Sequence, residues 1–129
     1  MRKTYLLFTA LFSFTVLGTS QKANAQAAYA GNYNMLGGYT SGYYYKGLYF
    51  KGYVTAASNG TVSYSAYFPY SGYPTYGKTG YGTGKITASG AFSFLTKGVY
   101  GSVQLLLQKY GYGYFYDSSG DGYFGLLKT

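Results

Sequence analysis

Several residue types on which most active sites depend are missing from this chain. It contains no cysteine, histidine or tryptophan, and its only acidic side chains are Asp117 and Asp121, so glutamate is absent as well. Without cysteine no disulfide framework can form, and general acid–base catalysis lacks its usual titratable groups. We therefore predict that the protein is not an enzyme and needs no cofactor.

Residues 1–25 have the pattern of a secretory signal peptide. Arg2 and Lys3 are followed by an apolar stretch over residues 5–18 and by the small-x-small sequence Ala23-Asn24-Ala25, an order typical of cleaved export signals. The apolar stretch is shorter than the ~20 residues that a membrane-spanning helix needs. We predict cleavage after residue 25 and a secreted, periplasmic or cell-surface location.

The remaining chain, residues 26–129, is one small domain of unusual composition. It holds all but one of the 21 tyrosines and all but one of the 21 glycines, and its seven lysines and two aspartates give a net charge of +5. Glycine costs about 1 kcal/mol at each helical position, whereas tyrosine suits a pleated sheet. The composition therefore predicts a Gly/Tyr-rich β domain.

Turn-forming residues recur at a fixed interval. Gly60, Gly90 and Gly120 each close a short polar cluster and lie 30 residues apart. This spacing predicts hairpins centred near 60, 90 and 120, and we interpret it as one hairpin that is repeated with its turn residues kept and its strand residues varied. The pair Asn59-Gly60 favours a type I′ turn, in which both central residues have positive φ.

Alternating apolar and polar residues predict the strands around these turns. Residues 46–55 and 61–68 flank the first turn, and residues 99–108 form the most regular strand, with Leu107 on its apolar face. Residues 69–84 predict a loop that ends in a glycine-bearing edge strand. The result is an all-β antiparallel meander of about six to eight short strands, forming either a small up-and-down barrel or a two-layer sandwich.

Oxygen-bearing side chains at the third turn resemble the opening of an EF-hand-type calcium loop. Asp117, Ser119 and Asp121 occupy its first, third and fifth positions, but Lys128 stands where the loop needs its glutamate. A polar turn between two strands explains the same residues. Asp117, Ser119 and Asp121 are thus the candidates for a metal site, and we expect a turn without metal.

Tyrosine exceeds what a domain of this size can bury, so part of it should lie on the surface. Exposed tyrosines bind proteins and glycans at low entropic cost, and lysines among them favour anionic partners. The surface-binding candidates are Tyr43, Tyr45, Tyr49, Tyr53, Tyr70, Tyr73, Tyr76 and Lys51. Tyrosine packed across strands against glycine is the competing explanation.

Two functions are consistent with these features. The first is a secreted or envelope-associated, structural or adhesive protein that presents tyrosine to an extracellular polymer, a glycan or another protein, with self-association through edge strands. The alternative is a small β-barrel that binds an apolar or sugar-like ligand in its interior. Export and the absence of arginine from residues 26–129 argue against nucleic acid. Eight membrane-spanning strands and their loops would need nearly all the residues of this domain or more, so we expect the mature chain not to cross a membrane.

Overall fold

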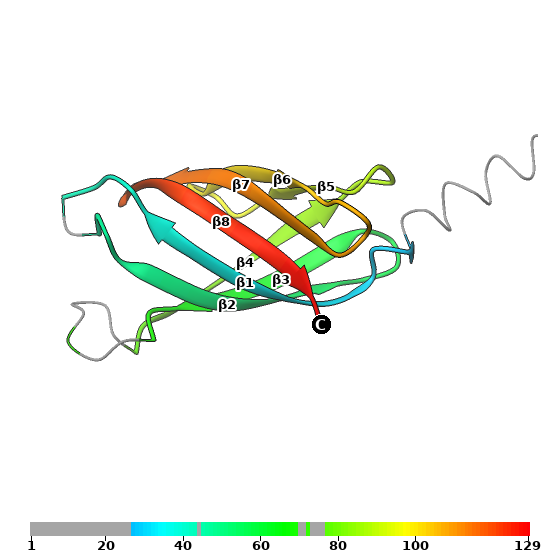
Figure 1. Ribbon diagram of the computed structural model, residues 1–129, viewed down its shortest axis with the longest axis horizontal. Coiled ribbons are helices and arrows are strands. Elements are labelled where there is room, and N and C mark those ends of the chain that lie inside the picture. Colours follow the sequence, from blue (N-terminus) through cyan, green and yellow to red (C-terminus); the bar gives the residue numbers. More distant parts are fainter. Residues whose placement is uncertain (1–26, 44, 70–71, 73–76) are drawn as a thin grey trace, which may run out of the picture.

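The chain folds into a closed up-and-down barrel of eight antiparallel strands (Figure 1). The computed structural model describes residues 27–43, 45–69, 72 and 77–129. The strands are β1 (Gly31–Tyr39), β2 (Tyr49–Ala56), β3 (Thr61–Tyr67), β4 (Thr79–Ile86), β5 (Ala91–Phe94), β6 (Tyr100–Gln104), β7 (Tyr110–Asp117) and β8 (Gly120–Lys128). The predicted all-β meander is confirmed, and the barrel is the arrangement that the chain adopts.

Pairing of the first strand with the last closes the barrel. β1 pairs with β8 from Tyr33 opposite Lys128 to Tyr39 opposite Gly122. Each strand therefore has a neighbour on both sides, and side chains along it alternate between the interior and the outer surface. No helix in the described part of the chain has the length and apolar character needed to cross a membrane.

One end of the barrel is filled with apolar side chains, and we call it the packed end. The turns after β2, β4 and β6 lie there, at the right in Figure 1. The inward residues Tyr33, Val54, Ile86, Phe92 and Val103 are all buried. Burial of each such side chain contributes roughly 1.5–3 kcal/mol, so this end carries much of the stability of the fold.

Glycine at inward positions makes room for aromatic rings from the neighbouring strand. A Cβ placed on Gly37 would lie 2.2 Å from Cζ of Phe50, and one placed on Gly82 would lie 2.4 Å from Cζ of Tyr64. Each ring thus occupies the space over a glycine on the strand beside it. The high glycine content thereby lets a narrow barrel enclose large aromatic side chains.

The turns at Gly60 and Gly90 are built alike. In the first, the N–H of Gly60 donates to the carbonyl of Ala57 over 2.9 Å, and the N–H of Ala57 donates to the carbonyl of Thr61. This is a three-residue loop in which a type I turn is followed by a left-handed glycine. The prediction of a type I′ turn is wrong, because φ is positive at Gly60 but not at Asn59, whose side chain accepts the N–H of Thr61 over 3.1 Å.

The third turn of the 30-residue series lies at the opposite end of the barrel. Gly120 is the first residue of β8 and pairs directly with Asp117, the last residue of β7. Between Gly60 and Gly90 the chain crosses the barrel twice, along β3 and β4, but between Gly90 and Gly120 it crosses three times, because β5 and β6 are short. The three turns are real, but their interpretation as one repeated hairpin is wrong.

The chain reverses earlier after β6 than the pattern predicts. β6 ends at Gln104, and the type I′ geometry occurs here, with φ of 52° at Leu107 and 56° at Gln108. The predicted strand through residue 108, with Leu107 facing inward, is wrong, since Leu107 is 78% exposed. Leu105 already fills the last buried position of this segment, so the following leucines must leave the core.

The glycine-bearing strand predicted at the end of the loop over residues 69–84 is present as part of β4, which continues beyond residue 84. β4 begins at Thr79 and pairs with β3 from Thr79 to Lys85. It pairs with β5 only from Gly84 to Ile86, because β5 is a short strand. From Thr79 to Gly82, β4 therefore has one ladder within the described residues, and edge-strand self-association, which stays a prediction, would have this stretch available.

Candidate functional site

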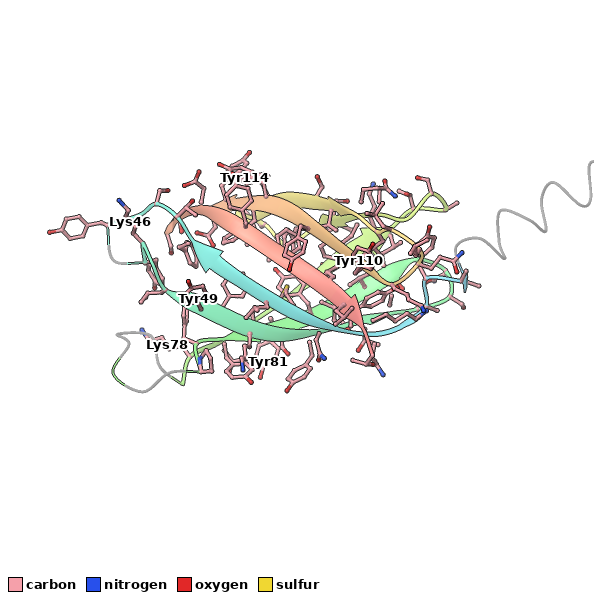
Figure 2. The ribbon with its side chains drawn as sticks, in the orientation of Figure 1. Lys46, Tyr49, Lys78, Tyr81, Tyr110 and Tyr114 are labelled. Carbon is pink, nitrogen blue, oxygen red and sulfur yellow. The ribbon has the colours of Figure 1, made fainter. Side chains whose placement is uncertain are left out.

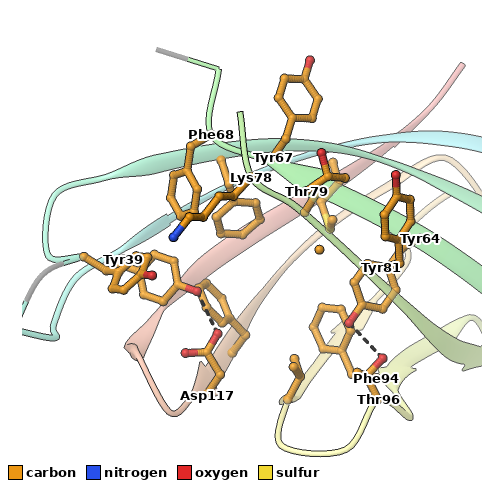
Figure 3. Close-up of a pocket in the computed structure, with 17 residues that line it drawn as sticks. Tyr39, Tyr64, Tyr67, Phe68, Lys78, Thr79, Tyr81, Phe94, Thr96 and Asp117 are labelled. Carbon is orange, nitrogen blue, oxygen red and sulfur yellow. Dashed lines mark hydrogen bonds between the residues drawn. The ribbon is translucent and has the colours of Figure 1, made fainter. Parts of the chain in front are cut away.

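A cavity of about 350 Å³ opens at the end of the barrel opposite the packed end (Figure 3). We call it the cup. Its walls are the ends of β1, β3, β5 and β7 and the beginnings of β2 and β4, and Met35 and Ala66 also line it. Cavities of about 300–1,000 Å³ with mostly apolar walls and a few polar groups are typical ligand sites.

Four rings around Tyr39 form the first wall of the cup. The Tyr39 ring lies 5.0 Å from the ring of Phe115, 5.2 Å from that of Tyr45 and 6.3 Å from that of Phe68, and Phe50 packs edge-on against Phe115 at 5.4 Å. Edge-to-face and offset contacts of this kind hold aromatic rings in fixed orientations. The wall is therefore a preformed aromatic surface.

The Tyr39 hydroxyl donates a hydrogen bond of 2.7 Å to Oδ2 of Asp117, which lines the same cavity. Burial raises the pKa of Tyr39 well above its ordinary value, and the hydrogen bond to Asp117 and the negative charge of that carboxylate raise it further. Tyr39 is thus a neutral donor at any physiological pH. Oδ1 of Asp117 accepts the N–H of Ser119 over 2.8 Å, which fixes the carboxylate in place.

Tyr64 and Phe94 form the second wall. Their rings pack edge-on at 5.2 Å, and the Tyr64 hydroxyl donates to Oγ1 of Thr96 over 2.9 Å. Thr96 in turn accepts the backbone N–H of Thr83 over 2.9 Å. Burial raises the pKa of Tyr64, and the hydrogen bond to Thr96 opposes that shift.

Backbone pairing between β4 and β5 is incomplete beside the second wall of the cup. From Thr79 to Gly82, the described part of β4 does not pair with β5. The last backbone hydrogen bond on this side joins the N–H of Leu95 to the carbonyl of Thr83 over 2.9 Å. Lys78 and Tyr81 lie at this rim and are labelled in Figures 2 and 3. The rim therefore adds a cation and an exposed phenol to an otherwise aromatic cup.

The predicted surface residues divide between the outside and the cup. Tyr43, Tyr49, Tyr53 and Lys51 are exposed, as a surface role requires. Tyr45 instead packs on Tyr39 and Phe68 and lines the cup. Tyr70, Tyr73 and Tyr76 lie outside the described residues.

The two candidate metal carboxylates share a hairpin but have different surroundings. Asp117 faces the cup, whereas Asp121 accepts the hydroxyls of Tyr114, over 2.6 Å, and of Ser41 on the outer surface. Ser119 contributes its backbone N–H to Asp117. Among the described residues no three histidine, cysteine, aspartate or glutamate side chains gather as a metal site.

Sequence reasoning missed most of the cup. Tyr39, Tyr64, Phe68 and Phe94 were not singled out, although alternation places Tyr64 and Phe68 on one face of the same strand. The run of small inward residues on β4, with glycine at 80 and 82, is the signal that could have indicated a hollow. The signal is weak, because glycine is also typical of loops.

No protein-family model, curated protein or solved structure matches this chain. The arrangement itself offers stacking surfaces, a carboxylate with remaining acceptor capacity and a cationic rim. These groups can hold a molecule by non-covalent contacts.

Proposed function

We propose that this protein is a β-barrel that binds a small, flat, mainly apolar ligand in the cup. The observation that carries the proposal is the cavity of about 350 Å³ between two walls of fixed aromatic rings. The packed end fills its interior with side chains, yet the cup end leaves space of a size that suits a ligand. Burial of apolar ligand surface against these rings would provide most of the affinity.

Two charged groups in the cup restrict the ligand further. Asp117 accepts hydrogen bonds from Tyr39 and Ser119, and a carboxylate has about four lone-pair sites, so it can accept another donor. Lys78 at the rim favours a ligand with an acceptor at its outer end. We propose a ring compound with a hydroxyl or amine donor directed toward Asp117.

Fluorescence of N-phenyl-1-naphthylamine tests this function, because this neutral aromatic probe brightens in apolar sites. The mature protein should bind the probe saturably. Ala66→Phe places a ring in the cup from β3 and should weaken binding at least tenfold. Ser63→Phe is the matched control, since Ser63 lies on the outer face of the same strand and is exposed.

Each variant must first show the circular dichroism spectrum of the parent protein. If Ala66→Phe binds the probe as tightly as the parent, or if Ser63→Phe weakens binding equally, the cup is not the site. Absence of saturable binding to the parent protein would also contradict the proposal.

We also propose that the protein is exported, on the strength of the signal-peptide pattern in residues 1–25. N-terminal sequencing of the protein recovered from outside the cytoplasm should begin at Gln26. Recovery of the intact chain from the cytoplasm alone would contradict export.

A second candidate function is a structural or adhesive role of the outer surface. The observation that favours it is the number of exposed tyrosines on the strands, which include Tyr49, Tyr53, Tyr81 and Tyr112. Beads coated with the mature protein should adhere to extracellular polymers or proteins, and replacing these four tyrosines with serine should reduce adhesion. Equal adhesion by both proteins would argue against this role.

A further inference from the structure

Two hollows on the outer surface of β7, β8, β1 and β2 join into one groove. The first, of about 300 Å³, includes Gly38 and Tyr49, and the second, of about 440 Å³, includes Gly125 and Tyr110. Leu36 and Tyr112 line both hollows. Tyr49 lies toward the cup end and Tyr110 toward the packed end (Figure 2), so the groove follows the barrel along its length.

Two rings lie over outward-facing glycines of this groove. Three ring carbons of Tyr112 come within 2.9–3.4 Å of the position that a Cβ on Gly125 would take, and two of Tyr49 come within 3.2–3.5 Å of that position on Gly38. Nevertheless Tyr112 is 84% exposed and Tyr49 is 55% exposed. Each ring therefore rests on the sheet with one side and presents the rest of its surface to solvent.

The groove carries no charged side chain among its described lining residues. This contrasts with the rest of residues 26–129, whose net charge is +5. A site for an anionic polymer would be expected to include lysine. The lining instead combines apolar surface with the hydroxyls of Tyr110, Tyr112 and Tyr123 and the amide of Asn34.

We infer that this groove binds a neutral, linear polysaccharide. The faces of sugar rings are apolar and stack on exposed aromatic rings, while their hydroxyls need donors and acceptors at the edges of the same site. Two partly exposed rings, Tyr112 and Tyr49, in one elongated groove suit consecutive parts of a chain. An acyl chain has no donors or acceptors for the tyrosine hydroxyls and Asn34. The inference rests on the surface role proposed above and specifies its ligand.

Electrophoresis of the mature protein in native gels that contain a polysaccharide tests the inference. Hydroxyethyl cellulose and laminarin are the neutral polymers, and polygalacturonate is the anionic one. Migration should be retarded by at least one neutral polymer, and added sodium chloride should not abolish the effect, because no charge pair is involved. Retardation by polygalacturonate alone would overturn the inference.

Substitutions at Tyr112 separate stacking from simple apolar contact. Tyr112→Phe keeps the ring and should bind within about threefold of the parent. Tyr112→Leu keeps an apolar cover over Gly125 but loses the ring, and should bind about tenfold more weakly, the loss expected for one stacked ring. Tyr53→Leu is the matched control, because Tyr53 is exposed on β2 but does not line the groove.

Thermal melting of each variant shows whether it is folded, and Leu36→Gln provides a second, exposed position in the groove at which weaker binding is expected. If Tyr112→Leu binds as the parent does, the groove is not a stacking site and the inference is wrong. The same holds if neither neutral polymer retards the parent. Adhesion of the coated beads to a protein would then show that the surface role survives with a different partner.

Discussion

The two ends of the barrel are built from the same eight strands, yet one is filled and the other is hollow. At the packed end, inward positions hold Val54, Ile86 and Phe92, and tight turns follow β2 and β4. At the cup end, inward positions of β4 are glycines 80 and 82, and the connections over residues 40–48 and 68–78 are longer. Alternation therefore provides an interior, whereas side-chain volume and loop length decide whether that interior is filled.

Truncation of a phenylalanine at each end should show the largest difference. Phe92 is 0% exposed and packs on Phe94 and Phe124, so Phe92→Ala should lower the free energy of unfolding by about 3–5 kcal/mol. Phe68→Ala in the cup should cost about 1 kcal/mol. Urea denaturation measures both values. If Phe92→Ala does not fold, Phe92→Leu, with an expected cost of about 1.5 kcal/mol, replaces it, and equal costs at the two ends would contradict the comparison.

Replacing a glycine with alanine tests how much space remains beside that glycine on β7 and on β4. A Cβ on Gly113 would lie 1.9 Å from the backbone carbonyl oxygen of Ser102, whereas on Gly80 the nearest atom is 4.0 Å away. Gly113→Ala should therefore destabilise the barrel by about 2–3 kcal/mol, and Gly80→Ala should be neutral or stabilise it by up to about 1 kcal/mol. Equal thermal midpoints for the two variants would show that the hollow at β4 is filled.

Alkaline pH should weaken the fold through tyrosines at both ends. Burial raises the pKa of Tyr33, and burial together with Asp117 raises that of Tyr39, above the ordinary value of 10.0. The folded state keeps these protons above pH 10 while the unfolded chain releases them. Stability is therefore complete below pH 10 and falls above it, by up to about 1.4 kcal/mol per pH unit for each group.

Denaturation at a series of alkaline pH values measures this decline. Tyr39→Phe should flatten it more than Tyr33→Phe, since only Tyr39 faces the carboxylate of Asp117. A decline that neither substitution changes would mean that other groups cause it.

The smallest expected effect is at a turn of the packed end. Leu107 and Gln108 have φ of 52° and 56°, a region that costs non-glycine residues about 1–2 kcal/mol. Replacing them with Asn-Gly should stabilise the protein by about 1 kcal/mol and raise the midpoint of thermal unfolding by about 4–8 °C. Ser119→Gly at the cup end should give no such gain, because Ser119 lacks a positive φ.

Much of the fold could be predicted because it depends on short-range patterns. Alternation identified Val54 and Val103 as inward residues, and the left-handed glycines Gly60 and Gly90 marked real turns. Prediction failed where packing between distant segments overrode the local pattern. Leu107 continues an apolar run, but the buried layer ends at Leu105, and no local pattern shows how deep a barrel is.

The candidate site was less predictable than the fold. Tyr45 was expected on the surface because tyrosine is abundant, and its contacts with Tyr39 and Phe68 bring together three separate segments of the chain. Exposure of Tyr49 and Tyr53 was predicted correctly, since they occupy the polar parity of one strand. The grouping of Tyr49 with Tyr112 in one groove depends on the pairing of β1 with β8, which barrel closure supplies.

Local sequence patterns specify that the domain is β, that the chain turns at Gly60, Gly90 and Gly120, and which residues of a strand share a face, because these follow from a two-residue backbone period and from glycine's access to positive φ. The pairing of β1 with β8, the position of Gly120 at the end opposite Gly60 and the hollow at one end instead depend on the complete fold. Closure joins residues as distant as Tyr33 and Lys128, and a cavity is what remains when all inward side chains have been placed, so neither is encoded in any one segment.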